Sequence, residues 1–234
     1  MNEKYPFVSV IIPTLNKEKY IETTLLSIKN QDYKGKYEII VVDSNSKDMT
    51  VKIARKYADK VIVTKRRGVS VGRNIGAEVA KGEILIFVDA DTTLLPNVIS
   101  KVVGHLRRKK VVGVVVPILC DNLKDWFISI LVEVSYYTLS KLNLHPLRGC
   151  CFGCKRDVFF KVGCFDEKLH LAEDIELGSR IKKIGKIEYI TDTYAIGSSR
   201  RLKRLGLFRT ICAWPFGYIK IKIFNKQPEY PPVR

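Results

Sequence analysis

Long apolar segments are missing from this sequence. No apolar run among its 234 residues reaches the roughly 18 residues that cross a bilayer. Val111–Cys120 is apolar but too short, and Pro117 within it indicates a buried strand instead. Met1–Pro6 also lacks the apolar core of a secretory signal peptide. We therefore expect a cytoplasmic chain that does not span the membrane.

Acidic residues are few beside basic ones: 24 Asp and Glu stand against 41 Lys and Arg, a formal net charge of +17. This excess favours polyanionic partners, namely nucleotides, nucleic acid or an anionic membrane surface. No RRM, KH or helix-turn-helix signature is present, so we expect no nucleic-acid partner. A non-catalytic protein that binds nucleotide sugars or nucleic acid is kept as the alternative outside the enzymes.

Several catalytic signatures are also absent. The chain has no Gly-x-x-x-x-Gly-Lys-Ser/Thr, no Gly-x-Gly-x-x-Gly after its first apolar run and no Gly-x-Ser-x-Gly. These absences argue against a P-loop site, a dinucleotide fold and a serine or cysteine hydrolase. The three histidines form no triad or metal pattern, and His105, in a basic stretch, is predicted to be solvated.

Cysteine occurs six times, and without a secretory signal these thiols should stay reduced. Cys151 and Cys154 form a Cys-x-x-Cys pair beside Cys150, a spacing also found in zinc sites. A structural zinc site needs a second ligand pair, and none is evident. We interpret these cysteines as small buried hydrophobic residues.

Apolar strands alternate with amphipathic helices through the first half of the chain, which predicts a parallel sheet with right-handed crossovers. The expected fold class is α/β: a Rossmann-like, mostly parallel sheet with helices on both faces, in a single domain over residues 1–234. The predicted strands are 7–12, 37–42, 61–64, 84–88, 111–117 and 187–190, with 148–155 extended. The predicted helices are 18–30, 47–58, 71–81, 126–142, 156–162 and 173–184.

The strand 84–88 is entirely apolar and is followed by two carboxylates, Asp89 and Asp91. Open α/β sheets bind their ligands at the carboxyl ends of their strands. Two carboxylates there need a compensating cation, and Mg²⁺ or Mn²⁺ prefers such oxygen ligands, especially when it already carries phosphates. The alternative is an acidic turn in which Asp91 caps a helix that begins near Leu94.

Other polar residues are expected at the same edge of the sheet. Asp43 ends the second strand and can accept hydrogen bonds from a nucleobase. The segment 66–74 combines glycines and arginines with the start of a helix, which suits a diphosphate. Glu173 and Asp174 open a later helix, where they can supply a general base or can simply favour the helix dipole.

Five short motifs follow one another in order through most of the chain. They are Phe7–Asn16 (FVSVIIPTLN), Ile39–Ser44 (IIVVDS), Gly72–Ala77 (GRNIGA), Ala80–Asp91 (AKGEILIFVDAD) and Glu173–Leu177 (EDIEL). Each is weak alone, but the ordered set resembles the family 2 glycosyltransferases of the GT-A fold. The resemblance implies inverting transfer of a sugar from a nucleoside diphosphate sugar, with UDP or GDP as the nucleotide, to an acceptor hydroxyl.

By that resemblance, the nucleotide-sugar side of the site would consist of Pro13, Leu15, Asp43, Arg73, Asp89 and Ala90. Asp91, together with Asp89, would bind Mn²⁺ or Mg²⁺ that bridges the diphosphate. Asp174 would take the proton of the acceptor hydroxyl, with Glu173 as its neighbour. The metal and the arginines would neutralise the diphosphate as the glycosidic bond breaks.

The chain departs from this family in two places. Many members carry a Gln/Arg-x-x-Arg-Trp motif after the base; here Arg201 and Arg204, on the diphosphate or acceptor side, remain and the tryptophan is missing. That weakens the case for a processive polysaccharide synthase. Many members also bind the metal through a late histidine, and none follows His170.

The implied acceptor is a saccharide or a polyprenyl-linked sugar; the alternative is direct transfer to a polyprenyl phosphate, as in dolichyl-phosphate sugar synthases.

The segment Leu202–Phe224 mixes basic residues with large apolar ones. This composition is typical of an amphipathic segment on anionic lipid, where each Lys or Arg contributes about 1 kcal/mol. A helix packed on the core is the alternative. We divide the chain into a nucleotide-sugar-binding half, 1–117, an acceptor-binding half, 118–200, and a basic amphipathic tail, 201–234. If the segment Leu202–Phe224 lies on anionic lipid, we expect the protein to be peripheral at the inner face of the cell membrane.

Overall fold

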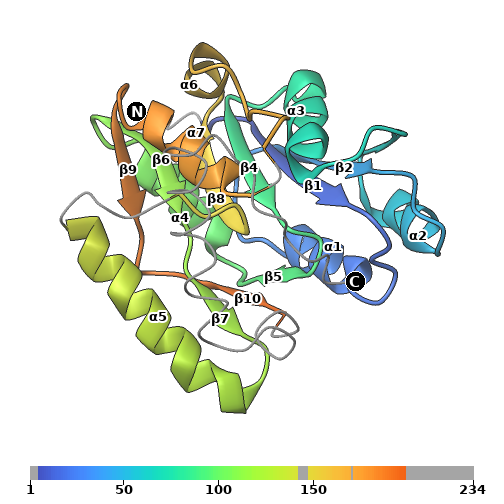
Figure 1. Cartoon of the computed structure of the whole chain (residues 1–234), viewed down its shortest axis with the longest axis horizontal. Coiled ribbons are helices and arrows are strands. Elements are labelled where there is room, and N and C mark those ends of the chain that lie inside the picture. Colours follow the sequence, from blue (N-terminus) through green and yellow to red (C-terminus); the bar gives the residue numbers. More distant parts are fainter. Residues whose placement is uncertain (1–4, 142–146, 170, 199–234) are drawn as a thin grey trace.

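The computed structural model describes residues 5–141, 147–169 and 171–198. Within these residues a seven-stranded sheet runs through the middle of the molecule, with helices on both faces (Figure 1). The strand order is β3-β2-β1-β4-β8-β6-β9. The strands are β1 (Val8–Thr14), β2 (Tyr37–Asp43), β3 (Lys60–Val63), β4 (Ile84–Val88), β6 (Val111–Val115), β8 (Cys151–Lys155) and β9 (Lys186–Tyr189).

The first four strands are parallel, as the alternation of strands and helices predicted. β1 pairs in parallel with β2 and β4, and β2 pairs in parallel with β3. β8 is the exception, because it runs antiparallel between β4 and β6, with Cys151 opposite Val88. Since β8 begins where β4 ends, the residues just before β8 lie at the carboxyl end of β4. The mostly parallel α/β class is therefore confirmed.

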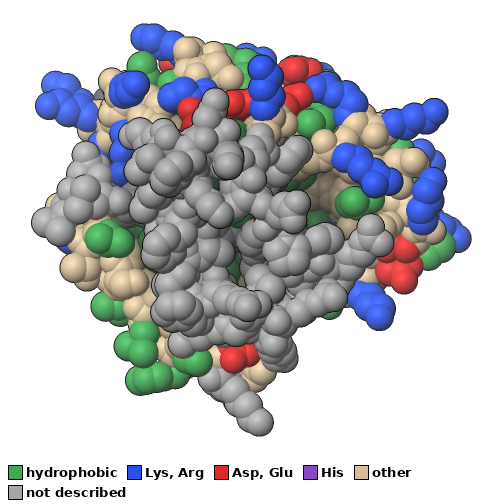
Figure 2. All heavy atoms as spheres, viewed as in Figure 1, with side chains coloured by type: hydrophobic (Ala, Val, Ile, Leu, Met, Phe, Trp, Pro, Cys, Tyr) green, Lys and Arg blue, Asp and Glu red, His purple; other side chains and the backbone are tan. Residues whose placement is uncertain are grey.

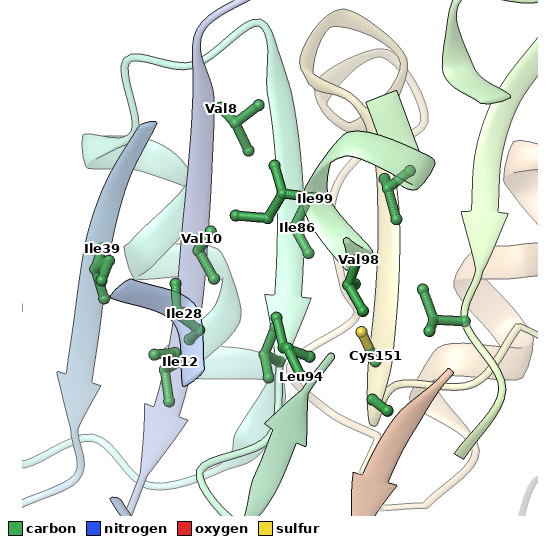
Figure 3. Close-up of a cluster of buried hydrophobic side chains, with 14 of the residues drawn as sticks. Val8, Val10, Ile12, Ile28, Ile39, Ile86, Leu94, Val98, Ile99 and Cys151 are labelled. Carbon is green, nitrogen blue, oxygen red and sulfur yellow. The ribbon is translucent and has the colours of Figure 1, made fainter. Parts of the chain in front are cut away.

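Both faces of the sheet are covered, so the central strands are apolar throughout instead of alternating with polar residues. In β1, Val10 and Ile12 pack in one core cluster, drawn in Figure 3, and Ile11 packs in the other. Helices α1, α2 and α4 supply side chains to the first cluster, and α3, α6 and α7 to the second. The helices are α1 (Ile21–Lys29), α2 (Thr50–Tyr57), α3 (Val69–Val79), α4 (Val98–Leu106), α5 (Leu123–Lys141), α6 (Arg156–Lys161) and α7 (Glu173–Ile181).

The Cys-x-x-Cys pair lies inside this core. Cys151 and Cys154 are fully buried, as predicted. Cys151 belongs to the first cluster and Cys154 to the second, so the two thiols lie on opposite faces of the sheet. Two thiols separated by the sheet cannot bind one metal ion, and the pair contributes to packing.

Helix α3 lies unusually close to β1 because two glycines face the strand. A Cβ at Gly72 would lie 2.9 Å from Pro13 Cβ, and a Cβ at Gly76 would lie 2.4 Å from Ile11 Cγ2. The Gly72–Ala77 motif therefore has a packing reason. It lets α3 approach the sheet, and Arg73, next to Gly72, is carried under the carboxyl ends of the strands.

A second, smaller sheet follows directly after Asp91 and was not predicted. In the described part of the chain it has the order β5-β10-β7. Its strands are β5 (Thr92–Leu94), β7 (Ile118–Cys120) and β10 (Ala195–Gly197). The alternative in which Asp91 caps a helix near Leu94 is wrong, because Leu94 lies in β5 and α4 begins at Val98, after Asn97. Three-residue strands carry too little periodicity to be recognised without their partners.

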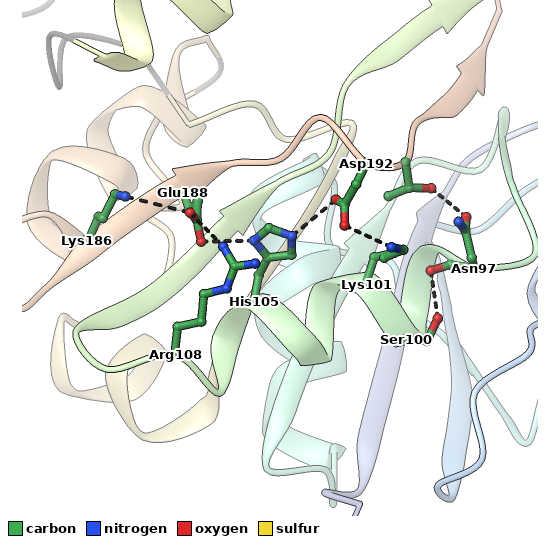
Figure 4. A network of polar contacts seen from close by, with 9 residues as sticks. Asn97, Ser100, Lys101, His105, Arg108, Lys186, Glu188 and Asp192 are labelled. Carbon is green, nitrogen blue, oxygen red and sulfur yellow. Dashed lines mark hydrogen bonds and ion pairs between the residues drawn. The ribbon is translucent and has the colours of Figure 1, made fainter.

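The prediction that His105 is solvated is also wrong. The ring is buried between two carboxylates, with Nδ1 3.0 Å from Glu188 Oε2 and Nε2 3.1 Å from Asp192 Oδ1 (Figure 4). Lys101 of the same helix pairs with Asp192 at 3.0 Å. Partial burial alone would raise the pKa of Glu188, but the hydrogen bond and charge of His105 and nearby cations lower it overall. The basic stretch of α4 thus fastens the helix to β9 and the segment after it.

The close approach of α3 to β1 can be tested with one methyl group. We expect Gly76→Ala to lower the free energy of unfolding by about 1–3 kcal/mol, because the new Cβ must displace Ile11 or shift α3. Urea unfolding measures the difference. Gly104→Ala in α4 is the matched control, because a Cβ there meets nothing within 4 Å. It should be neutral or stabilising, by about 0.5–1 kcal/mol. Equal unfolding curves for the two variants would contradict this account of the packing.

Candidate functional site

The loops after β1 and β2 are locked together at the carboxyl edge of the sheet. Asn16 N donates to Ser46 Oγ at 2.7 Å, and Lys47 N donates back to Asn16 Oδ1 at 2.9 Å. Asn16 and Asn45 both adopt left-handed backbone conformations, with φ of 51° and 66°. Asparagine tolerates this region better than most residues do. The two loops therefore form a fixed rim for a ligand.

Asp43, predicted on the nucleotide side, ends β2 within this rim. The residue is fully buried, with Oδ1 accepting from Ser46 N at 2.7 Å and Oδ2 from Ser46 Oγ at 2.5 Å. Two other predicted residues lie at the end of β1, Pro13 within the strand and Leu15 directly after it. Pro13 is half-buried against α3, whereas Leu15 is 41% exposed at the rim. An ordered carboxylate beside an exposed apolar side chain suits a flat, hydrogen-bonding ring.

Asp89 and Asp91 follow β4, and each is compensated by a cation of the chain. Asp89 Oδ1 accepts from Arg73 Nη2 at 3.0 Å, and Asp91 Oδ2 accepts from Lys17 Nζ at 2.8 Å. Ala90 between them is buried in the core, and its carbonyl accepts from Thr24 Oγ1 at 3.1 Å. The two carboxylates are thus the partly exposed residues of this turn, while Ala90 anchors it.

Arg73 is the centre of the site. It is only 2% exposed, and it donates to carboxylates on two elements that are 84 residues apart in the chain, Asp89 and Glu173. Nη1 lies 3.1 Å from Glu173 Oε1, and Nη2 also donates to the carbonyl of Gly149 at 2.9 Å. Burial lowers the pKa of Arg73, but the surrounding carboxylates raise it overall. The guanidinium therefore joins the strand-end carboxylates to the acidic pair of α7.

Gly149 was not recognised from the sequence, although it holds both halves of the site. A Cβ at this position would lie 2.6 Å from Arg73 Nη2, so a larger residue would have to displace the guanidinium. Its carbonyl accepts from Arg73, and its N–H donates to Asp174 Oδ2 at 2.7 Å. The glycine- and cysteine-rich composition of 148–155 was the available signal, but it carried no indication of these partners.

Glu173 and Asp174 lie buried at the start of α7, directly after Ala172 in a left-handed conformation with φ of 59°. Asp174 accepts backbone hydrogen bonds from Gly149 and, at 2.8 Å, from Ile175. Burial, and next the charge of Glu173, raise the pKa of Asp174 to about 7. A carboxyl with such a pKa can exchange a proton near neutral pH. The favourable helix dipole alone does not account for this arrangement.

The carboxylates after β4 fit a hard divalent cation that arrives with a ligand. Among the described residues, no group of three or more His, Cys, Asp or Glu side chains is placed to hold a metal ion. Asp89 and Asp91 are therefore a pair of carboxylates without a third such side chain beside them in the described part of the chain. Mg²⁺ and Mn²⁺ are commonly held by one or two carboxylates together with substrate phosphates and water.

The predicted Arg201 and Arg204, and the basic tail, lie outside the described residues.

Comparison with known proteins agrees with the sequence motifs. A family model described as glycosyl transferase family 2 matches residues 9–163. The chain is 30% identical over 200 residues to an uncharacterised glycosyltransferase of Rickettsia typhi, covering 80% of this chain and 62% of that protein. It is 41% identical over 90 residues to the poly(ribitol-phosphate) beta-N-acetylglucosaminyltransferase TarS of Staphylococcus aureus, covering 36% of this chain and 16% of TarS. The chain spans less than two thirds of the length of these relatives.

Solved structures show the same arrangement of strands and helices. The mannosyltransferase PcManGT from Pyrobaculum calidifontis, in complex with GDP-Man and Mn²⁺, has a TM-score of 0.71 at 23% identity, covering 97% of this chain and 66% of that chain. Residues 1–349 of S. aureus TarS, in complex with UDP-GlcNAc, have a TM-score of 0.66 at 23% identity, covering 82% of this chain and 58% of that chain. At this identity the likeness is one of fold.

The central role of Arg73 predicts a large loss of stability when its charge is removed. We expect Arg73→Met to lower the free energy of unfolding by about 3–5 kcal/mol, because the buried Glu173 and the partly exposed Asp89 then lose their cation. Adding Glu173→Gln to this variant should recover at least about 1 kcal/mol. Urea unfolding of the single and double variants measures both effects.

Arg66→Met is the control for that measurement, because Arg66 pairs with Glu167 at the surface. Its cost should stay below about 1 kcal/mol. Equal losses at positions 66 and 73, or no recovery in the double variant, would show that the buried guanidinium does not balance the carboxylates.

Proposed function

Because the chain belongs to glycosyl transferase family 2, we propose that it transfers a sugar from a nucleoside diphosphate sugar to an acceptor hydroxyl with inversion at the anomeric carbon. The chain has the GT-A fold of the glycosyltransferases it resembles. The single observation that carries the proposal is the buried Asp174, fastened through Gly149 and Arg73 to the strand-end carboxylate Asp89. One rigid unit thereby holds a candidate base beside a candidate diphosphate site.

The donor is proposed to lie over the rim formed by the loops after β1 and β2. Asp43, held by Ser46, would accept hydrogen bonds from the base of the nucleotide, and the exposed Leu15 would contact its ring. Asp91 and Asp89 would hold Mn²⁺ or Mg²⁺. Such an ion supplies charge neutralisation for the diphosphate leaving group. The GDP-Man, Mn²⁺ and UDP-GlcNAc in the solved structures of similar fold support a donor and cation of this kind.

Asp174 is proposed to act as the general base. The acceptor hydroxyl gives its proton to Asp174 as its oxygen attacks the anomeric carbon and the bond to the diphosphate oxygen breaks. Burial keeps the pKa of this carboxyl near 7, so it accepts a proton more readily than an ordinary aspartate does. The positive charge of Arg73 offsets the negative charge of the neighbouring Glu173, which limits the repulsion between Glu173 and a deprotonated Asp174. A single displacement of this kind inverts the anomeric centre.

A buried, basic carboxyl favours a neutral hydroxyl acceptor over a phosphate. A polyprenyl phosphate is already an anion and needs no base. Direct transfer to it would therefore give Asp174 no proton to accept. We therefore propose a saccharide or lipid-linked sugar as the acceptor. The alternative, a polyprenyl-phosphate glycosyltransferase, makes the opposite prediction for Asp174.

The role of Asp174 is tested by its amide. A thermal-shift screen of UDP-, GDP- and dTDP-sugars with Mn²⁺ first identifies the donor. We then expect Asp174→Asn to lower kcat by about 10²- to 10⁴-fold with the donor-induced stabilisation unchanged. In the wild type, kcat should fall as the pH drops below the Asp174 pKa of about 7, because the protonated carboxyl cannot accept a proton.

Glu176→Gln is the matched control, since Glu176 lies in the same first turn of α7 but is only partly buried and pairs with Arg180. It should keep kcat within about threefold of the wild type. Full activity of Asp174→Asn would favour the polyprenyl-phosphate reading. The absence of stabilisation by every donor would contradict a nucleotide-sugar site.

Contact with a membrane surface is proposed from helix α5. Large apolar side chains on it face outward, and Figure 2 shows hydrophobic atoms gathered where Figure 1 places this helix. The most exposed are Phe127 at 66% and Leu131 at 56%, one helical turn apart. None of the described helices is long and apolar enough to cross a bilayer. An apolar row of this kind suits the lipid boundary, where a lipid-linked acceptor would be found.

We expect the full chain to co-sediment with anionic liposomes at low salt, and Phe127→Glu/Leu131→Glu to reduce the bound fraction about tenfold or more, because each apolar side chain contributes about 1.5–3 kcal/mol on burial. Leu26→Glu on α1, where Leu26 is 42% exposed, is the control and should bind as the wild type does. No binding by the wild type, or equal binding by all three proteins, would exclude α5 as the docking surface.

A further inference from the structure

Lys17, in the loop between β1 and α1, pairs with the second strand-end carboxylate, Asp91. Its Nζ lies 2.8 Å from Asp91 Oδ2, between residues 74 positions apart in the chain. The two side chains are only 23% and 20% exposed. Ion pairs of freely exposed side chains contribute little, but a pair withdrawn from water to this extent is screened less by solvent and salt.

The backbone of Lys17 is fixed by the same interlocked loops that form the rim of the site. Its N–H donates to Thr50 Oγ1 at 2.7 Å, and its carbonyl accepts from the N–H groups of Tyr20 and Ile21, both at 2.9 Å. The backbone that carries the ammonium therefore has a defined position shortly before α1. Less side-chain and backbone freedom is lost when it pairs with Asp91 than for a lysine on a loose loop.

We infer that Lys17 is a built-in counter-ion for Asp91 that a divalent cation must displace. This inference rests on the proposed function, in which Asp91 is a ligand of Mn²⁺ or Mg²⁺. The ammonium lies on Oδ2, one of the two oxygens that Asp91 offers to a cation. Without a metal, Lys17 compensates the charge of this carboxylate. Binding of a metal alone must first break this ion pair.

The displaced ammonium needs another anion, and the diphosphate of the donor supplies one close to the same carboxylates. Metal and donor should therefore bind cooperatively: the diphosphate takes up the charge of Lys17 and leaves Asp91 to the cation. Cooperativity of this kind is a coupling free energy between two ligands, and it is reciprocal. The residue that transmits part of it here is Lys17, which makes it a positioning residue for the metal site.

The test is Mn²⁺ binding to the donor-free chain of 234 residues, measured by the electron paramagnetic resonance of free Mn²⁺. We expect Lys17→Met to tighten Mn²⁺ binding about 5- to 10-fold, because the ammonium that competes for Asp91 Oδ2 is gone. Lys19→Met is the control; Lys19 is exposed two residues away, and its removal changes the net charge by the same amount. It should leave the Mn²⁺ affinity within about twofold of the wild type.

The same titration with UDP or GDP present measures the coupling. In the wild type the nucleotide should tighten Mn²⁺ binding by a larger factor than in Lys17→Met, which lacks the ammonium that competes for Asp91 Oδ2. Lys17→Arg, which keeps the positive charge, should retain the wild-type coupling, and thermal unfolding confirms that each variant is folded.

Failure of this inference differs from failure of the proposed metal site. If Asp91→Asn abolishes Mn²⁺ binding and Lys17→Met leaves the affinity unchanged or weaker, Lys17 is not a competitor and the inference is overturned. If Asp91→Asn binds Mn²⁺ as tightly as the wild type does, Asp91 is not a ligand, and the metal assignment fails together with the inference.

Discussion

The site depends on one buried guanidinium. Arg73 is withdrawn from water and makes ion pairs with Asp89, from the end of β4, and Glu173, from the start of α7. Neither the burial of the guanidinium nor that of Glu173 is favourable alone. The attraction between Arg73 and the two carboxylates offsets this cost, and the carbonyl of Gly149 accepts a further hydrogen bond from the guanidinium. The distance between Asp89 and Glu173 is therefore set by the size of the guanidinium group that contacts both.

Placing this guanidinium requires a particular backbone. Gly72 and Gly76 let α3 approach β1 to a distance that no larger residue allows, and Gly149 leaves the space that the fork fills. Because β8 enters antiparallel beside β4, the chain just before β8 reaches the carboxyl edge of the sheet. The glycine positions and the reversed strand thus serve one purpose, which is to surround Arg73 with acceptors.

The sequence predicted this architecture well where the signal was local. The strand 84–88 was placed with its observed bounds, and the all-apolar pattern of the central strands correctly indicated a sheet covered on both faces. Prediction failed where partners lie far apart in the chain. The solvated reading of His105 overlooked partners 83 and 87 residues away, and Lys17 was not noticed because Asp91 lies 74 residues further on. Composition around a residue does not reveal which distant charge it meets.

The roles proposed for the four acidic residues of the site follow from which of them makes an ion pair with Arg73 or Lys17. Asp89 and Glu173 share Arg73, and Asp91 has Lys17. Among the described residues, the hydrogen bonds to Asp174 come from the backbone N–H groups of Gly149 and Ile175. Backbone dipoles orient a carboxylate without supplying a full charge, so burial dominates and its pKa rises to about 7. Of these four carboxyls, Asp174 is the one to which the described residues give no ion pair, and it is thereby suited to moving a proton; the three that are paired are suited to holding charge in place.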